Sequence, residues 1–171
     1  MNTRTFRTRL AFPLLALAAL AALALLTACT RESNAELQTY TGINAIRAQH
    51  GMGPLQADAN LVKIARMRSQ QMATGAPFSH DALPGCESYQ VEFVCLMDQN
   101  GVPHSYSGEN IAWNTWPWDQ TAQEAVTQWE NSPHHLANIL NCHYERFGTG
   151  VAQGADGKIY YTMIFDGNIS C

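Results

Sequence analysis

The chain contains Gly108-Glu109-Asn110-Ile111-Ala112 and, further on, Trp129-Glu130-Asn131-Ser132-Pro133-His134-His135-Leu136-Ala137-Asn138-Ile139-Leu140. The first stretch places an acid directly after a glycine turn and predicts a short strand over residues 109–113. The second predicts a short helix that is capped by Ser132, has proline at its first position and carries two histidines. Upstream, Phe78-Ser79-His80 follows the end of a helical pattern. Together these stretches predict a cleft that holds two imidazoles and a carboxylate.

The N-terminus has the layout of an export signal. Three arginines precede an apolar run over residues 10–26 that is rich in Leu and Ala. This run is too short for a confident membrane span and is typical of a secretory signal. It ends in Leu26-Thr27-Ala28-Cys29, which resembles the bacterial lipoprotein box, in which cleavage precedes the Cys and the Cys is acylated. An ordinary signal cleaved after Ala28, which leaves Cys29 free, is the alternative.

We favour the lipoprotein interpretation, in which residues 1–28 are the signal peptide, 29–35 the lipidated Cys and a tether, and 36–171 a single domain. Cleavage leaves 143 of the 171 residues, enough for one domain with a core. It also removes three of the ten basic residues and none of the fourteen acids, so the net charge becomes −7. This charge excludes a nucleic-acid partner and a basic lipid-binding surface. We therefore expect an exported monomer, held on the bacterial cell envelope by the acyl chains on Cys29.

Four further cysteines predict two disulfides. An even number of cysteines in an exported chain is typical of a disulfide framework, and four cysteines allow three connectivities. We favour Cys86–Cys95, which closes a local loop, and Cys142–Cys171, which fixes the C-terminus. The absence of any C-x-x-C spacing in the sequence disfavours a cysteine metal site.

Capping signals and helical periodicity predict helices in the first part of the domain. Ser33-Asn34-Ala35-Glu36 and Thr121-Ala122-Gln123-Glu124 have the pattern of capping boxes, and Asp58 can cap a further helix. One side of that further helix carries Leu61, Ile64, Ala65, Arg68 and Met72. Residues 81–106 contain several Gly and Pro, and we expect them to be irregular.

The C-terminal part predicts a β-hairpin. Residues 147–152 and 159–165 have the period of strands, and Gly154-Ala155-Asp156-Gly157 between them is a turn signal. Both faces of the second strand carry bulky side chains, which indicates a sheet covered on both sides. We therefore predict an α/β/α sandwich with a small antiparallel sheet flanked by helices.

The ordered set of motifs resembles the CAP superfamily (SCP domain; cysteine-rich secretory, antigen 5 and pathogenesis-related proteins), and its bacterial branch in particular. The matching pieces are Asn44-Ala45-Ile46-Arg47-Ala48-Gln49-His50-Gly51, Pro54-Leu55, Ser79-His80, Gly108-Glu109-Asn110-Ile111-Ala112, Trp129, Ser132-Pro133, His135-Leu136-Ala137-Asn138-Ile139-Leu140 and Gly148-Thr149-Gly150-Val151. The resemblance covers residues 36–166. It implies an α/β/α sandwich with a cleft lined by two histidines and two glutamates.

The resemblance assigns His80 and His135 to the two histidines, which bind a divalent metal, often zinc, in several members. Glu109 matches the first acid. His134 stands where many bacterial relatives have Gly and adds an imidazole. The eukaryotic position of the second acid is occupied here by Ser132.

Other residues near that position leave the second acid unassigned. Glu130 follows Trp129 directly, on a different side of the helix, and Glu124 lies a turn earlier. Ser132 and His135 together suggest a nucleophile, but the serine starts a helix, and we expect its hydroxyl to cap that helix.

Two imidazoles can hold zinc or another divalent cation only weakly, with positions left for water or substrate. The alternative is that both rings hydrogen-bond to Glu109 and to backbone. Glu109 can take a proton from metal-bound water, or it can bridge backbone N–H groups in a structural role. Trp113 and Trp116, with Trp118 in the same loop, can stack on a sugar ring or cover a lipid chain, or they can pack over the sheet edge.

These features support two hypotheses for function. The first is a binding module of the cell envelope for a lipid, glycan or protein ligand, with a metal that adjusts affinity. The second is a metal-assisted hydrolase of envelope peptide or peptidoglycan. The fold alone does not decide between them, because one fold can host many activities.

Overall fold

The computed structural model describes residues 11–168, and at residues 11–26, 28 and 29 the backbone alone. The elements follow in the order α1 (Ala11–Gln49), β1 (Gln56–Ala57), α2 (Ala59–Ala73), α3 (Glu92–Gln99), β2 (Tyr106–Asn114), α4 (Thr121–Glu130), α5 (Pro133–Ile139), β3 (Tyr144–Gln153) and β4 (Ile159–Gly167). The chain divides into two units, Met1–Arg31 and Glu32–Cys171, and the sheet belongs to the second.

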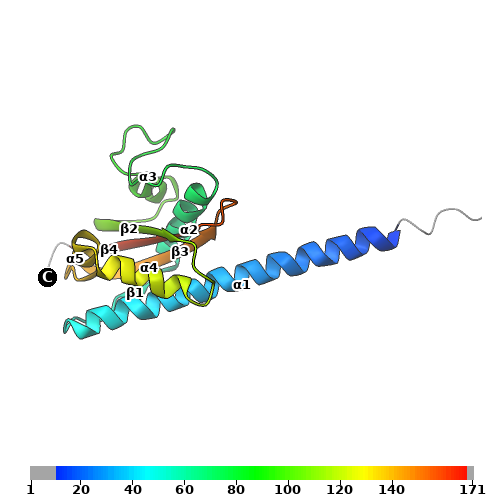
Figure 1. The fold of residues 1–171 in the computed structure, drawn as a ribbon. Helices are drawn as coiled ribbons and strands as arrows, with labels where there is room; N and C mark the ends of the chain where they lie inside the picture. Colours follow the sequence, from blue (N-terminus) through cyan, green and yellow to red (C-terminus); the bar gives the residue numbers. More distant parts are fainter. Residues whose placement is uncertain (1–10, 169–171) are drawn as a thin grey trace, which may run out of the picture. The chain divides into compact units, whose positions relative to one another are not determined.

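The sheet has four strands in the order β1-β3-β4-β2 (Figure 1). The three long strands are antiparallel, whereas the two-residue strand β1 pairs with β3 in parallel, so the sheet as a whole is mixed. The predicted hairpin joins β3 to β4. Its turn contains Gly157 at φ 83°, and the Gly154 N–H donates to the Lys158 carbonyl at 2.8 Å. Glycine adopts this left-handed conformation without the steric cost of a side chain.

Helices cover both faces of the sheet, as the alternation in the last strand predicts. Tyr161, Met163 and Phe165 of β4 pack in a core with side chains of α1, α4 and α5. Ile164 packs on the opposite face with side chains of α2 and α3. Figure 1 shows α2 and α3 on one side of the sheet and α4 on the other. The α/β/α sandwich is therefore confirmed.

Two glycines of β3 let α2 lie directly on the sheet. A Cβ at Gly148 would collide with the backbone at Leu61, and a Cβ at Gly150 would collide with the backbone at Ala65. The start of α2 is set by Asp58, whose carboxylate accepts from the N–H groups of the second and third helical residues at 2.8 and 3.1 Å. This confirms the predicted cap. The close approach also brings the side chains of Arg68 and Met72, later in α2, into contact with side chains of β2.

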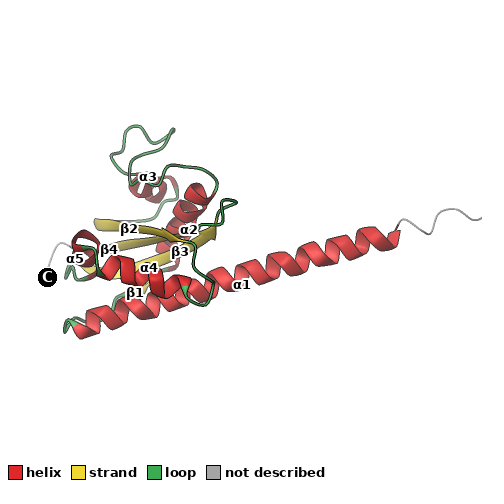
Figure 2. Cartoon of the chain, viewed as in Figure 1, coloured by secondary structure: helices red, strands yellow, loops and turns green. Residues whose placement is uncertain are grey.

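Three expectations about helices are wrong. Ser33 lies inside α1, which begins at Ala11, because the residues before Ser33 are also helical. Thr121 is the first helical residue of α4 and not its cap, and its hydroxyl donates to the Asn114 side chain at 2.5 Å. The segment expected to be irregular contains the eight-residue helix α3, after the long loop that is green in Figure 2.

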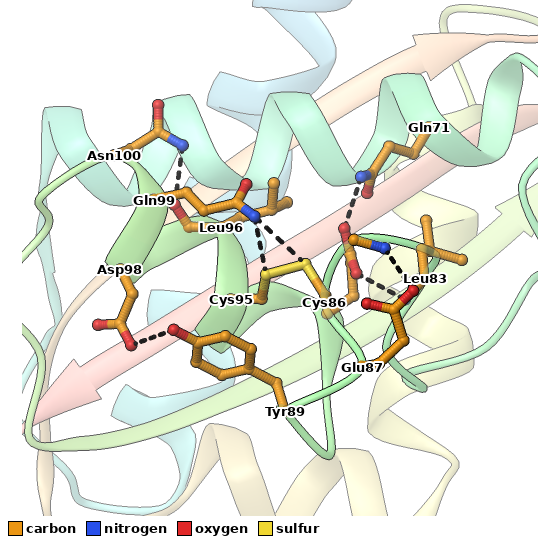
Figure 3. The surroundings of a disulfide bond; sticks show 12 residues. Gln71, Leu83, Cys86, Glu87, Tyr89, Cys95, Leu96, Asp98, Gln99 and Asn100 are labelled. Carbon is orange, nitrogen blue, oxygen red and sulfur yellow. Dashed lines mark hydrogen bonds between the residues drawn. A yellow bond between two sulfur atoms is a disulfide. The ribbon is translucent and has the colours of Figure 1, made fainter.

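The disulfide Cys86–Cys95 is present and joins the loop before α3 to the middle of α3, with the two Cα atoms 5.8 Å apart (Figure 3). Cys142 is also disulfide-bonded. Cys171 and the side chain of Cys29 lie outside the described part of the chain, so the pairing Cys142–Cys171 and the acylation of Cys29 stay predictions. Of the helices that the structure describes, none combines the length and the hydrophobicity that crossing a membrane requires.

Strand β2 forms one edge of the sheet, and side chains cover three of its outward carbonyl groups. The three carbonyls belong to alternate residues, and each accepts from a side chain of α4 or α5: Glu109 from Asn138 at 3.4 Å, Ile111 from Trp129 at 3.1 Å, and Trp113 from Gln128 at 3.4 Å. These contacts hold α4 and α5 against the edge and thereby place His135 next to β2.

Candidate functional site

The centre of the candidate site is a buried ion pair between helix α2 and strand β2. Glu109 lies opposite Ile164 in the sheet and so faces the α2 side. Its Oε1 accepts from Arg68 Nε at 2.9 Å, and the two side chains are 1% and 0% exposed. Arg68 also donates to Gln71 Oε1 at 3.0 Å and to the Ser79 carbonyl at 2.7 Å. A buried charge needs such partners, because desolvation is costly.

His80 takes the second oxygen of Glu109. Its Nδ1 lies 2.6 Å from Glu109 Oε2, and its side chain is 43% exposed. Because a carboxylate oxygen accepts, we assign the proton of the neutral ring to Nδ1. The other nitrogen, Nε2, then keeps its lone pair and can accept a hydrogen bond or bind a metal.

His135 is held on α5 by its backbone. Its carbonyl accepts from Asn110 Nδ2 at 3.1 Å, and Asn110 Oδ1 accepts from Asn138 at 2.8 Å. The His135 Nδ1 is buried and has no hydrogen-bond partner in the described part of the chain. Burial lowers the pKa of this ring, and the nearby imidazoles His80 and His134 lower it further. A neutral ring with an unpaired nitrogen is suited to a ligand or a water molecule.

The residues present fit at most a metal site with two protein nitrogens. His80 offers Nε2, and His135 carries a buried nitrogen without a partner. Glu109 already engages both oxygens, so it would orient His80 rather than bind the metal itself. No group of three or more His, Cys, Asp or Glu residues that could hold a metal occurs among the described residues. Two protein ligands make a weak, exchangeable site for zinc.

An aromatic groove of about 520 Å³ adjoins His135. The lining side chains and backbone come from the end of β2, the loop after it, α4, α5 and the segment before His80: Phe78, Ile111, Ala112, Trp113, Asn114, Thr115, Trp116, Gln128 and His135. Three rings stay substantially exposed, Phe78 at 45%, Trp113 at 40% and Trp116 at 50%. Trp118 instead packs against the main core, so the aromatic loop serves both the groove and the fold.

The other predicted cleft residues have different surroundings. His134 is exposed on α5, and Glu130 is half-buried at the last position of α4. Neither they nor Ser132 line the groove. Ser132 does occupy the N-cap position of α5, but its side chain makes no capping hydrogen bond, so the expected hydroxyl contact is wrong. Pro133 explains this in part, because its missing N–H reduces the number of donors to be capped.

Sequence reasoning missed Arg68 as a site residue. The helical periodicity places it on the same side of its helix as Leu61, Ile64, Ala65 and Met72, and the structure buries it there. An arginine among apolar positions is itself a signal, because buried arginines are almost always paired with an acid.

Comparison with known proteins identifies relatives of this chain. The model of the Cysteine-rich secretory protein family (CAP) matches residues 40–165. The uncharacterized protein YkwD of Bacillus subtilis (strain 168) is 36% identical over 110 residues, which are 64% of this chain and 39% of YkwD. The uncharacterized membrane protein YlbC of the same organism is 31% identical over 134 residues, which are 78% of this chain and 35% of YlbC. The chain therefore spans less than half the length of either relative.

Among solved structures, an extracellular protein from Bacillus anthracis that contains an SCP domain is similar, with a TM-score of 0.67 and 26% identity. The match covers 80% of this chain and 41% of that protein. A cysteine-rich secretory protein from Staphylococcus aureus shares the fold at a TM-score of 0.59 and 20% identity, with 80% of this chain and 39% of that protein covered.

Proposed function

Because the chain belongs to the cysteine-rich secretory protein family, we propose that it is an exported binding module of the bacterial cell envelope. The ligand occupies the aromatic groove beside His135. The observation that carries this proposal is the set of exposed rings on one groove, Phe78, Trp113 and Trp116, next to a buried imidazole nitrogen that has no partner in the described chain. Exposed aromatic surface beside a few polar groups is typical of a binding site.

The groove suits a ligand with one apolar surface and one polar end. The rings can cover an acyl chain, the face of a sugar or an apolar side chain of a protein. His135 lines the groove and offers a hydrogen-bonding group to the polar end, and His80 lies near His135 but outside the residues that line the groove. Zinc or another divalent cation, held weakly by these two rings, would supply a positive charge there and so adjust affinity for an anionic group.

The engagement of Glu109 favours binding over hydrolysis. A general base must be able to reach the proton that it abstracts, and both oxygens of Glu109 already accept hydrogen bonds from Arg68 and His80. Metal-assisted hydrolysis of envelope peptide or peptidoglycan stays the alternative. The unpaired nitrogen of His135 beside His80 is the observation that favours it.

We further propose that the protein acts as a monomer anchored to the envelope membrane through acylated Cys29. The lipoprotein-like sequence around Cys29 supports this placement. The names of the relatives agree with export, since one is an extracellular protein and another a membrane protein. Metabolic labelling with a fatty acid, in the wild type and in Cys29→Ser, tests it. A label that persists in Cys29→Ser would refute the assignment.

Calorimetric titration tests the binding proposal with three probes: a single-chain phospholipid, a soluble N-acetylglucosamine oligomer and an apolar tetrapeptide. We expect at least one to bind, and Trp116→Ala to weaken that binding about tenfold, the equivalent of about 1.4 kcal/mol. Tyr106→Ala is the matched control, because Tyr106 is a ring outside the groove with 38% exposure. No binding of any probe, or equal losses in the two variants, would overturn the proposal.

The hydrolase alternative has its own test. Purified peptidoglycan is incubated with the protein in the presence of zinc, and soluble fragments are measured. The binding proposal expects no release above that of the double variant His80→Ala, His135→Ala. Release that requires both histidines and Glu109 would establish the alternative instead.

A further inference from the structure

A second buried acid lies close to the site, at the start of α3. Glu92 is 2% exposed, and its two oxygens accept hydrogen bonds from uncharged groups, Gln71 Nε2 at 2.7 Å and the Leu83 N–H at 2.8 Å. It contributes nothing to the groove. Within the described chain these contacts are all with uncharged groups, and burying a carboxylate in this way is costly, which points to a specific role for Glu92.

The contacts of Glu92 fasten the segment that carries His80. The Glu92 N–H donates to the His80 carbonyl at 3.0 Å, and Asp81 forms an antiparallel bridge with Val91. The carboxylate of Glu92 holds the Leu83 N–H three residues after His80. The backbone on the C-terminal side of His80 is therefore tied to the start of α3 at three points.

The same carboxylate is linked to the ion pair at the centre of the site. Gln71 donates to Glu92 and accepts from Arg68, which in turn donates to Glu109 and to the Ser79 carbonyl. A continuous hydrogen-bonded chain thus runs from α3 through α2 to β2. The carbonyls of two successive residues accept from members of this chain, Ser79 from Arg68 and His80 from the Glu92 N–H.

The disulfide ties the same loop to α3 at a further point. Cys95 lies on α3, one turn after Glu92, and Cys86 lies in the loop between Leu83 and Val91. Figure 3 draws Gln71 and Leu83 among the surroundings of this disulfide. The bond limits how far the loop can move from α3, because it joins the middle of the loop to the helix on which the loop is anchored.

We infer that Glu92 is a positioning residue for His80: it fixes the backbone of residues 79–83 so that His80 Nδ1 meets Glu109 and His80 Nε2 keeps its lone pair for a ligand. The Cys86–Cys95 disulfide supports the same placement. The importance of this role for function rests on the proposed binding function. The placement of His80 by Glu92 does not depend on what the groove binds.

Glu92→Gln tests the inference with little change in shape. A glutamine at this position has only one accepting oxygen, so an amide N–H group must face either Gln71 Nε2 or the Leu83 N–H, which are both donors. We expect the His80 segment to loosen and the Nδ1–H tautomer of His80 to fall about twofold or more in population at about pH 8. Long-range ¹H–¹⁵N NMR spectra of the histidine rings in the full chain report this tautomer directly.

Glu36→Gln is the matched control. Glu36 is also buried, at 8% exposure, and its oxygens accept from Arg66 at 2.8 and 2.6 Å, but these contacts do not lead to His80. We expect it to lower stability without altering the His80 tautomer. The inference is wrong if His80 is unchanged in Glu92→Gln, or if it changes equally in Glu36→Gln.

Two further variants complete the test. If Glu92→Gln does not fold, Gln71→Met breaks the same chain and is expected to shift the tautomer in the same direction, and no shift would overturn the inference. Trp116→Ala should abolish or weaken probe binding while His80 keeps its tautomer. Failure of the binding proposal therefore leaves the NMR result intact, and failure of the positioning role appears in the NMR result alone.

Discussion

Replacement of Arg68 by methionine gives the sharpest test of how the site is built. The change removes three hydrogen bonds, to Glu109, Gln71 and the Ser79 carbonyl, and leaves a carboxylate that is 1% exposed without its cation. Breaking a buried ion pair on one side costs about 3–5 kcal/mol. Because His80 still contacts the other oxygen of Glu109, we expect a loss near the lower end, about 3 kcal/mol.

Arg66→Met is the matched control on the same helix. Its side chain is 54% exposed and pairs with Glu36, so its loss should cost about 0.2–1 kcal/mol. Urea unfolding followed by circular dichroism measures both variants with the disulfides intact. For a chain of this size, the expected loss of about 3 kcal/mol in Arg68→Met corresponds to a fall in its thermal midpoint of roughly 6–12 °C.

The double variant Arg68→Met, Glu109→Leu separates the charge from the packing. Removing both charged groups should recover part of the stability that the single variant loses, since an apolar pair of similar volume is often no worse than a buried ion pair. If Arg68→Met and Arg66→Met unfold at the same urea concentration, the buried pair is not the source of stability that its geometry indicates.

Three further changes test other parts of the fold. Gly150→Ala should lower the free energy of unfolding in urea by about 1–3 kcal/mol because the new Cβ meets the backbone of α2. The control Gly53→Ala, where a Cβ meets open space, should be near neutral, and equal effects would contradict the close packing of α2. Asp58→Ala should cost about 1 kcal/mol in the same assay through the lost helix cap, and an unchanged midpoint would mean that the cap is dispensable. Burial lowers the pKa of His135 below 6.5, so the unfolded chain binds a proton at higher pH than the folded one, and stability should fall as the pH drops below 6.5. His135→Asn should flatten this dependence of stability on pH in urea titrations on either side of that pH. An unchanged dependence would mean that other groups cause it.

The elements that could be predicted from the sequence are those whose signals are local. The Asp58 cap, the hairpin turn at Gly157 and the two-faced strand β4 each depend on residues close together in the chain. The Thr121 capping box failed because the Asn114 side chain, which lies outside the four-residue pattern, accepts from the hydroxyl. Helix α3 is only eight residues long and follows a loop rich in Gly and Pro, so its periodicity is too brief to stand out.

The site was predictable only in part, for a related reason. His80, Glu109 and His135 carry chemistry that a sequence pattern can indicate, and the structure brings His80 onto Glu109. The residues that hold these side chains in place have no recognisable pattern in the sequence. Arg68 occupies an apolar helical position, and Glu92 becomes buried only because α3 forms, so both contacts depend on long-range packing. Pattern reasoning therefore finds the reactive groups sooner than the groups that orient them.

The covering of strand β2 by side chains bears on behaviour at high local concentration. An open strand edge can template a strand from another molecule, and the proposed lipid anchor would crowd copies of this chain on a membrane surface. On β2, the outward carbonyls of Glu109, Ile111 and Trp113 already accept from side chains of α4 and α5. The side chains of Trp129 and Asn138 thus occupy acceptors that another strand could use, in addition to their role in the fold. Loss of Asn138 would free the Glu109 carbonyl at this edge, and loss of Trp129 would free the Ile111 carbonyl and also empty a fully buried position in the core.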